Sequence, residues 1–417
     1  MLAAAVFPAD PREVPLGPDD PGRYWRFEEL ARTPAYRPAG FPDSEAEGMR
    51  ALMVTGKGPG NSTAEFFCYY AVPEGEMPSG GWPGVVLVHG GGGTAFPKHV
   101  EKWRSLGFAV IAPDWYNSRP TPASTNAPPR RADVSRAPLE GGKRQDHVAN
   151  VANMVLAHSL LRSFPEVNAD RTVFVGLSWG SWYGGCVAAV DGRFRGCVEI
   201  YCGDLWPNVR KGRELVNGRF LHAAKVPMWW AVSTNDANVT PDSLNDGFAA
   251  CGRWDGVSVV NKLPHSHVGF QFPCVHRMAR YYTGTGKRLP RLGMPRLEGN
   301  ELVARVLDVG GGIDRVKIGY TTDGTSPFVK RLWKYADGVL AGDTVRARLP
   351  KGTVICYLAA FEKGESRFRD LCGTTPFFNV PPPSSPGVTF RFDDARPAGR
   401  FRRPAKIYCE NKAGIDG

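Results

Sequence analysis

Near the middle of the 417-residue chain stands the sequence Arg171-Thr-Val-Phe-Val-Gly-Leu-Ser-Trp-Gly180. Its first half is a short apolar run with β-branched residues, which predicts a buried strand. Its second half matches the pattern G-x-S-x-G, in which the serine occupies a strained strand-to-helix turn and its hydroxyl projects above a sheet. A helical pattern from Trp182 to Val190 follows. We therefore predict that Ser178 is a nucleophile; the alternative is a glycine-rich turn with a buried serine.

A second glycine-rich stretch follows an earlier strand-like run. The apolar segment Val85 to Val88 leads into His89-Gly-Gly-Gly-Gly93. Glycines after a strand let backbone N–H groups turn toward a substrate oxygen. We place an oxyanion hole at the N–H groups of Trp179 and of Gly91 or Gly90, with His89 orienting the loop. A phosphate-binding loop is disfavoured because no Gly-Lys-Ser/Thr follows.

The activation of Ser178 needs an imidazole that takes its proton and a carboxylate that holds the imidazole. Asp236 comes after the strand-like run 228–232, and the order serine, acid, histidine is the order expected for this strand pattern. Two histidines, His265 and His267, follow the last strand-like run, 257–260, where the base is expected. We take His267 as the first choice for the base and His265 as the alternative. Asp242 and Asp246 compete for the role of the acid, but their place predicts solvated residues at a helix start. His276 falls on the closing helix, where a structural role is expected, and the histidines without comparable context are His99, His147, His158 and His222.

Strand and helix patterns alternate through much of the chain, which predicts a mostly parallel sheet with helices on both faces. Beyond residue 290 the pattern changes to short alternating strands with Gly/Asp-rich turns, typical of a small antiparallel β-sandwich. We divide the chain into an irregular N-terminal arm, 1–45, a catalytic domain, 46–290, a β-sandwich domain, 291–380, and a Pro-rich linker with a basic tail, 381–417.

Several segments together carry a family resemblance. They are His89-Gly-Gly-Gly-Gly-Thr-Ala-Phe96 with Trp103, Asp170-Arg171, Gly176-Leu-Ser-Trp-Gly180, Val190-Asp-Gly-Arg-Phe194, Ser233-Thr-Asn-Asp236 and Pro264-His-Ser-His267. Over about residues 80 to 285 the chain resembles bacterial α/β-hydrolases related to acetyl xylan esterases and dienelactone hydrolases. The chain departs from the pattern of this group in two places. Ser181 replaces the second glycine that is common after G-x-S-x-G, and the tract 115–142 matches no pattern of the group.

The resemblance implies an α/β-hydrolase fold and the hydrolysis of acyl esters, acetyl esters in the first place, through an acyl-enzyme. Ser178 would attack, His267 would act as base and then acid, and Asp236 would orient it. No metal or organic cofactor is implied. The substrate would be a small ester or an acylated carbohydrate, which would make the chain a carbohydrate esterase.

The pocket candidates are His89, Trp115, Trp182 and Trp206. Tryptophans near the site offer flat faces for stacking on sugars, although packing in the core or under a lid explains most tryptophans equally well. One alternative function is a serine peptidase of the prolyl-oligopeptidase type. Such peptidases usually carry a large N-terminal propeller domain, and the fewer than 90 residues before strand 85–88 are too few for one. Another is a hydrolase-fold binding protein without activity, disfavoured because all triad candidates are present.

Composition excludes other classes of function. The net charge is +11, but the basic residues are scattered apart from two clusters, around 130–144 and 396–406, and no nucleic-acid-binding signature accompanies them. The nine cysteines form no CxxC pair, which disfavours a zinc site, a redox dithiol or a disulfide framework. No run approaches the ~20 apolar residues that cross a bilayer.

The compartment and the oligomeric state stay open. The apolar start Met1 to Phe7 lacks the basic region of a signal peptide. We expect a soluble protein without a membrane segment, either cytoplasmic or secreted with its leader absent from this sequence.

Overall fold

The computed structural model describes residues 20–39, 48–91, 93–115, 147–202, 218–363 and 371–380. All of them lie in one compact unit, Met1–Val380. The predictions for the linker and tail, for Trp206 and for most of the tract 115–142 lie outside the described residues. Within the described ranges, no helix is both long enough and apolar enough to cross a membrane.

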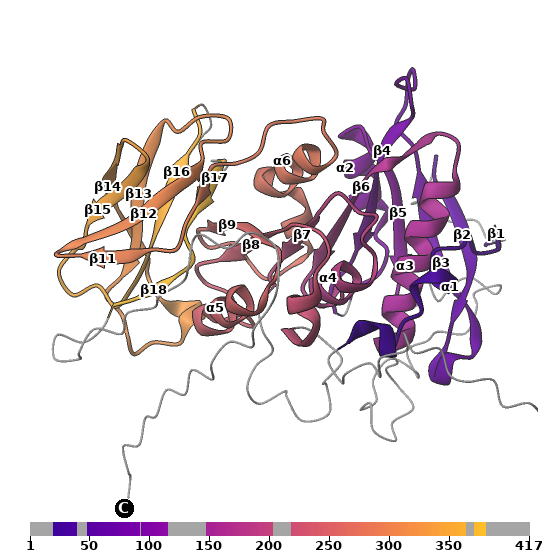
Figure 1. The fold of residues 1–417 in the computed structure, drawn as a ribbon, viewed down its shortest axis with the longest axis horizontal. Coiled ribbons are helices and arrows are strands. Elements are labelled where there is room, and N and C mark those ends of the chain that lie inside the picture. Colours follow the sequence, from indigo (N-terminus) through magenta and orange to yellow (C-terminus); the bar gives the residue numbers. More distant parts are fainter. Residues whose placement is uncertain are drawn as a thin grey trace, which may run out of the picture. The chain divides into compact units, whose positions relative to one another are not determined.

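A mixed sheet forms the larger part of the described unit (Figure 1). Its strands are β1 (Tyr36–Pro38), β2 (Arg50–Lys57), β3 (Thr63–Ala71), β4 (Trp82–Val88), β5 (Ala109–Asp114), β6 (Val167–Leu177), β7 (Cys197–Ile200), β8 (Met228–Ser233) and β9 (Trp254–Val260). They pair in the order β1-β2-β3-β5-β4-β6-β7-β8-β9. The pairs up to β3–β5 are antiparallel, and those from β5 to β9 are parallel. This arrangement confirms the expected α/β-hydrolase fold.

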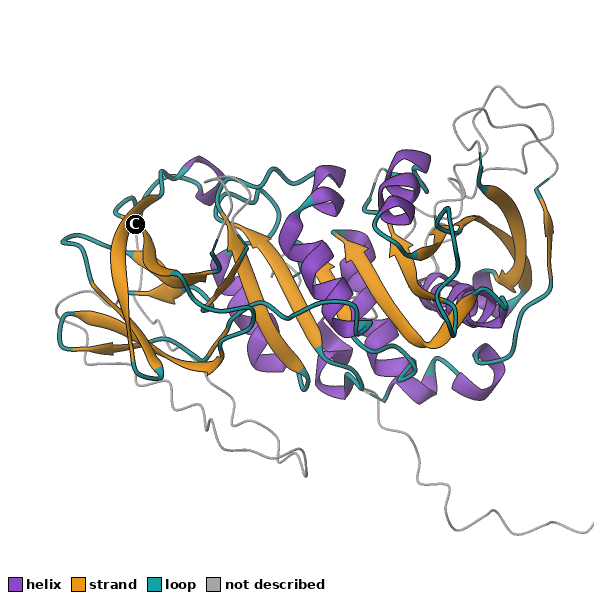
Figure 2. Cartoon of the chain, turned by 90° about the horizontal axis from the view of Figure 1, so that it is seen from above, coloured by secondary structure: helices purple, strands orange, loops and turns teal. Residues whose placement is uncertain are grey.

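Helices cover both faces of this sheet (Figure 2). They are α1 (Phe27–Leu30), α2 (Pro97–Ser105), α3 (His147–Ser163), α4 (Trp179–Val190), α5 (Pro241–Ala250) and α6 (Pro273–Tyr282). On one face α6 is tied to the end of α2 by a hydrogen bond from Arg280 to the Leu106 carbonyl. On the other face α3 packs beside α4, and Phe248 of α5 stacks on Trp230 of β8. The parallel strands are therefore buried on both sides, as their near-continuous apolar sequences predict.

The order of the central strands fixes where a site can open. After β4 the chain moves to β5 on one side and then returns to β6 on the other. In such a sheet the crevice lies at the carboxyl ends of the strands between which the direction switches. Because Val88 of β4 lies opposite Gly176 of β6, the glycine-rich stretch and Ser178 leave the sheet side by side.

The C-terminal part is a set of antiparallel strands with a hydrophobic cluster of its own. The strands are β10 (Arg291–Leu292), β11 (Arg296–Glu298), β12 (Glu301–Asp308), β13 (Arg315–Thr321), β14 (Lys334–Ala341), β15 (Thr344–Arg348), β16 (Ile355–Phe361), β17 (Cys372–Thr374) and β18 (Phe378–Asn379). Its core contains Leu302, Ile318 and Leu358, all fully buried. The four-part division of the chain stays a prediction, because this β region and the large sheet lie in the same compact unit.

The β region is joined to the edge of the large sheet. Thr374 of β17 pairs with Val257 of β9, and the Ser258 hydroxyl donates to the Cys372 carbonyl at 2.6 Å. The Asn235 amide donates to two carbonyls of the segment after β13, those of Val329 at 3.2 Å and Arg331 at 2.7 Å. Asn235 immediately precedes Asp236, so the β region is fastened next to the predicted acid.

The N-terminal arm differs from the expected irregular segment. Its described part contains η1 (Pro21–Arg23), α1 and β1, and β1 pairs with β2. Trp25 is only 3% exposed, and its indole N–H donates to the Val148 carbonyl of α3. The arm is ordered here because it covers apolar surface of α3, a long-range contact that local sequence patterns do not reveal.

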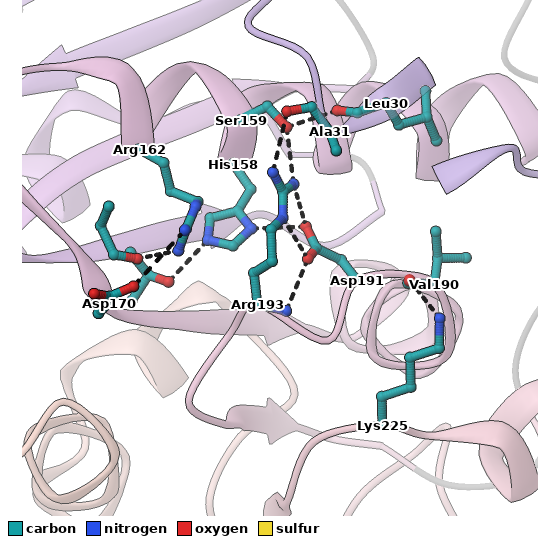
Figure 3. Close-up of polar contacts among 12 residues, drawn as sticks. Leu30, Ala31, His158, Ser159, Arg162, Asp170, Val190, Asp191, Arg193 and Lys225 are labelled. Carbon is teal, nitrogen blue, oxygen red and sulfur yellow. Dashed lines mark hydrogen bonds and ion pairs between the residues drawn. The ribbon is translucent and has the colours of Figure 1, made fainter. Parts of the chain in front are cut away.

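A buried polar network joins α3 to the turn after α4 (Figure 3). His158 Nδ1 lies 2.7 Å from Asp191 Oδ2, its Nε2 lies 2.8 Å from the Thr172 hydroxyl, and its ring stacks on Phe194. The Arg193 guanidinium donates to both carboxylate oxygens of Asp191. Burial alone would raise the pKa of Asp191, but His158 and Arg193 hold that pKa well below its usual range.

Candidate active site

The turn at Ser178 has the geometry that the G-x-S-x-G pattern predicts. Ser178 stands between β6 and α4 with φ 55° and ψ −115°, a backbone conformation that non-glycine residues rarely adopt. A Cβ on Gly176 would lie 2.5 Å from the Gly180 carbonyl oxygen, and a Cβ on Gly180 would overlap the carbonyl oxygen of Val88. The two glycines are therefore required by the close approach of α4 to the strands.

A hydrogen-bonded chain of three side chains converges on this turn. The Ser178 hydroxyl lies 2.8 Å from His265 Nε2, and His265 Nδ1 lies 2.9 Å from each carboxylate oxygen of Asp236. Asp236 is 2% exposed and also accepts hydrogen bonds from the backbone N–H groups of Asn238 and Val239. These bonds fix the carboxylate, which in turn holds the imidazole with Nε2 toward the serine.

The histidine that reaches Ser178 is His265, and the preference for His267 is corrected on this point. The segment after β9 turns at residues 261–262, where Lys262 has φ 51°, and then enters η7 (His267–Gln271), and this path brings His265 to the serine. His267 is the first residue of η7, and its Nε2 accepts a hydrogen bond from the Gly90 N–H at 3.1 Å. The second choice for the base is therefore the one that the geometry favours.

Tyr201 positions His265 and was not singled out from the sequence. Its ring stacks on the imidazole of His265 with centroids 4.5 Å apart. Its hydroxyl donates to the carbonyls of Pro264 at 2.5 Å and Ser266 at 3.4 Å, on either side of His265. Tyr201 has φ 58°, and this unusual backbone at the end of β7 was the detail that sequence patterns could not supply.

The glycine loop, defined as Gly90, Gly91 and Gly93, lies against Ser178 and the neighbouring Trp179. A Cβ on Gly90 would lie 3.1 Å from Ser178 Cβ, and a Cβ on Gly91 would lie 2.5 Å from Trp179 Cδ1. Of the predicted oxyanion donors, the Gly90 N–H is directed to His267. Gly91 is exposed and lies against the ring of Trp179, the residue after the serine, and the role of both backbone N–H groups as oxyanion donors stays a prediction.

A buried network supports the base of this loop. His89 Nδ1 lies 2.8 Å from the Gly90 carbonyl, and His89 Nε2 lies 3.2 Å from Asp114 Oδ1. The Thr94 hydroxyl donates to the other oxygen of Asp114 at 2.6 Å, and the Trp115 indole donates to the His89 carbonyl. His89 therefore orients the loop, as expected, but it is 2% exposed and does not line an open pocket.

The aromatic pocket candidates are mostly packed into the core. Trp115 and Trp182 are 3% and 8% exposed. Trp115 stacks on His89, and Trp182 lies against Trp179 with centroids 4.7 Å apart. Trp206 lies outside the described residues. Unlike Trp115 and Trp182, Trp179 keeps a partly exposed surface.

The remaining candidates occupy other environments. His147 lies 2.8 Å from the Tyr183 hydroxyl, and His276 Nε2 donates to the Phe270 carbonyl. Asp242 accepts a hydrogen bond from Asn379 of the β region, and His222 is exposed in η6 (Gly218–Ala223). In the part of the chain that the structure describes, no three His, Cys, Asp or Glu side chains are grouped to hold a metal ion.

Part of the chain matches a known protein family. Residues 67–246 match the model of the dienelactone hydrolase family. A search of curated proteins gave no match. Among solved structures, an acetyl xylan esterase from Paenibacillus is 17% identical with a TM-score of 0.48, covering 65% of this chain and 96% of its own.

Two further structures show the same range of similarity. A dienelactone hydrolase from Klebsiella pneumoniae, itself assigned only provisionally, is 17% identical with a TM-score of 0.38, covering 56% of this chain and 95% of its own. A puromycin-hydrolysing peptidase of Mycobacterium tuberculosis is 17% identical with a TM-score of 0.41, covering 59% of this chain and 40% of its own. At these TM-scores the assignment rests on strand order and on the family match. The chain has an α/β-hydrolase fold, and its residues 67–246 match the dienelactone hydrolase family.

Proposed function

We propose that the chain is a serine hydrolase that cleaves carboxylic esters with Ser178 as its nucleophile. The observation that carries the proposal is the hydrogen-bonded chain from Ser178 through His265 to Asp236, beside a glycine loop. The match of residues 67–246 to a hydrolase family supports it independently. A serine, an imidazole and a carboxylate in this order are what acyl transfer to water requires.

In the acylation step the Ser178 oxygen attacks the ester carbonyl while His265 Nε2 takes the hydroxyl proton. Asp236 holds His265 Nδ1–H and stabilises the imidazolium that forms. The negative charge on the substrate oxygen is met by the backbone N–H groups of Trp179 and Gly91. His265 then gives its proton to the alcohol oxygen as the C–O bond breaks, which leaves an acyl group on Ser178.

In the deacylation step water replaces the alcohol. His265 takes a proton from the water as the water oxygen attacks the acyl carbon, and it returns that proton to the Ser178 oxygen. The acid is released and the serine hydroxyl is restored. Each protonation uses the same Nε2, which lies 2.8 Å from the serine oxygen. One imidazole therefore serves as base and as acid in both halves of the reaction.

The substrate class is proposed as a short acyl ester, with acetyl as the first acyl group and an acylated carbohydrate as the first alcohol to test. The partly exposed face of Trp179, next to Gly91, lies close enough to the nucleophile to contact a bound sugar or acyl group. Aromatic faces and sugar rings stack through their apolar surfaces.

The test combines covalent labelling with turnover. A fluorophosphonate probe is expected to modify Ser178, as mapped by peptide mass spectrometry, and the protein is expected to hydrolyse p-nitrophenyl acetate and acetylated xylan. The exposed Ser105, whose hydroxyl donates to the Lys102 carbonyl, supplies the control Ser105→Ala, in which the probe is expected to label Ser178 as in the wild type. Absence of labelling at Ser178 would favour a binding protein, and labelling with cleavage of peptide but not ester substrates would favour a peptidase.

A further inference from the structure

His267 joins the loop of the proposed base to the glycine loop. Its Nε2 accepts the Gly90 N–H at 3.1 Å. A Cβ on Gly93 would overlap this same Nε2, so the ring lies directly against both ends of the glycine loop. Phe96 packs edge-on to the ring at 4.9 Å, and His99 and Phe270 lie beyond it. The imidazole thus fills the space between η7 and the start of α2.

The contact requires a neutral ring with its lone pair on Nε2. Nε2 can accept from a backbone N–H only when it carries no proton, so the proton of the neutral ring is on Nδ1. Burial lowers the pKa of His267 to about 4, and the facing groups His89, His99, Lys98 and His265 add to this effect. At neutral pH the ring is therefore held in the form that accepts from Gly90.

We propose that His267 is a positioning residue that fixes the glycine loop by accepting the Gly90 N–H, so that the next amide, that of Gly91, is held toward the substrate oxygen. The proposal rests on the proposed function, because it concerns the oxyanion donor of that reaction. It assigns separate roles to two histidines that are two residues apart: His265 moves the proton, and His267 holds the loop.

The geometry explains why the Gly90 amide needs an acceptor. A Cβ on Gly90 would lie 3.0 to 3.1 Å from atoms of Leu177 and Ser178, so the Gly90 backbone packs closely against the turn that carries the serine. A backbone N–H that is buried without an acceptor destabilises the conformation that holds it. The bond to His267 satisfies that N–H, while the Gly90 carbonyl is held by His89 and by the Gly93 N–H.

The primary test compares two substitutions at one position. Gln offers Oε1 near the place of Nε2 and can accept the Gly90 N–H, whereas Leu fills the space without an acceptor. His267→Leu is expected to lower kcat for p-nitrophenyl acetate about 10- to 100-fold with KM changed by less than about threefold, since oxyanion contacts act in the transition state. His267→Gln is expected to retain at least about a third of the wild-type kcat.

A matched control uses the neighbouring ring. In the described part of the chain both ring nitrogens of His99 are buried without a hydrogen-bond partner, and the ring packs against Phe96, His267 and Phe270. His99→Phe keeps the aromatic packing and removes no hydrogen bond, so its kcat is expected to stay within about twofold of wild type.

A second variant keeps His267 and disturbs its place. Gly93→Ala introduces the Cβ that overlaps Nε2, and it is expected to lower kcat as His267→Leu does. If both act through the one contact, the double variant is expected to be no slower than the worse single variant. The single variant Gly93→Ala tests the same contact even if His267→Leu does not fold.

Three outcomes would overturn the proposal: unchanged kcat in folded His267→Leu, equal losses in His267→Leu and His267→Gln, or a rise in kcat on removal of the ring. The last would mean that His267 blocks the Gly90 amide. Failure of the proposed function is recognised separately, because then the wild-type protein itself would neither label at Ser178 nor hydrolyse the ester.

Discussion

Two His–Asp pairs in the described part of the chain have a hydroxyl at the second ring nitrogen, His265–Asp236 and His158–Asp191, and we propose that only the first serves a nucleophile. In His265–Asp236 the second ring nitrogen faces the hydroxyl of Ser178, which is 8% exposed at a strained turn. In His158–Asp191 the second ring nitrogen faces the hydroxyl of Thr172, which is fully buried within β6. The distances in the two pairs are nearly the same, so distance alone does not separate a catalytic group from a structural one.

The difference lies in what surrounds each pair. The carboxylate of Asp191 is also held by Arg193, whose guanidinium donates to the Ser159 hydroxyl and to the Ala31 carbonyl. That pair therefore ties the N-terminal arm to α3 and to the turn after α4. Among the described residues Asp236 accepts from the backbone N–H groups of Asn238 and Val239 besides His265, and Asp236 follows β8 at the carboxyl edge of the sheet.

The largest expected effect is on the nucleophile. Ser178→Ala removes the attacking oxygen and is expected to lower kcat for p-nitrophenyl acetate by about 10⁴-fold or more, with the Tm unchanged within a few degrees. Steady-state kinetics and thermal unfolding measure the two quantities. Residual activity above one hundredth of wild type in the purified variant would show that another group attacks the ester.

The two carboxylates are expected to separate activity from stability. Asp236→Asn leaves the fold intact and is expected to lower kcat by about 10³- to 10⁴-fold, because the amide no longer holds His265 in the reactive orientation. Asp191→Asn leaves Arg193 without its charge partner and is expected to lower the free energy of unfolding by about 3 kcal/mol, with kcat per folded molecule unchanged.

Urea unfolding and active-site titration of both variants make the comparison. The two pairs would have the same role if both substitutions changed the same quantity. A loss of kcat in Asp191→Asn without loss of stability would contradict the structural role of His158–Asp191.

A smaller effect is expected at the hydroxyl that faces the structural pair. Thr172→Val keeps the shape of the side chain and removes the oxygen that lies 2.8 Å from His158 Nε2. Leaving a buried ring nitrogen without its partner is expected to cost about 1–3 kcal/mol of unfolding free energy. Esterase activity per folded molecule should not change; a fall in kcat would show that the network of Figure 3 is coupled to the site.

A separate effect, on the pH dependence of stability, concerns histidines that pack against rings and cations instead of a carboxylate. Burial lowers the pKa values of His99, His267 and His276 to about 4 from the usual 6.5. Between these pH values the unfolded chain binds more protons than the folded chain, so stability is complete above pH 6.5 and falls as the pH falls toward 4. The Tm is expected to drop by several degrees over that range.

His99→Phe removes one of these three groups and is expected to flatten the dependence of the Tm on pH. Thermal unfolding at closely spaced pH values gives the slope for both proteins. An identical slope in the variant would show that His99 does not contribute to it.

Much of the fold follows from local sequence. The glycines around Ser178 and the apolar run before it predict the strand, the turn and the helix, because steric limits at Gly176 and Gly180 leave few alternatives. Asp236 follows from its place after β8, since parallel strands bring their carboxyl ends to one edge. These predictions concern short segments whose geometry depends mainly on neighbouring residues.

The choice between His265 and His267 could not be made from the sequence. It depends on Tyr201, more than sixty positions earlier, whose hydroxyl holds the backbone on both sides of His265. The burial of Trp115 and the packing of Trp25 on α3 depend on similar long-range contacts. Local periodicity carries no information on which distant side chain will lie against a loop.

The junction between β9 and β17 has a consequence for how the molecule can be divided. Without the β region, β9 would be the last strand of the parallel sheet, and its backbone groups around Val257 and Val259 would lose the pairing that Thr374 supplies. An open apolar edge of this kind invites another chain to add a strand. A fragment ending near residue 290 is therefore expected to self-associate, because the β region is what covers this sheet edge.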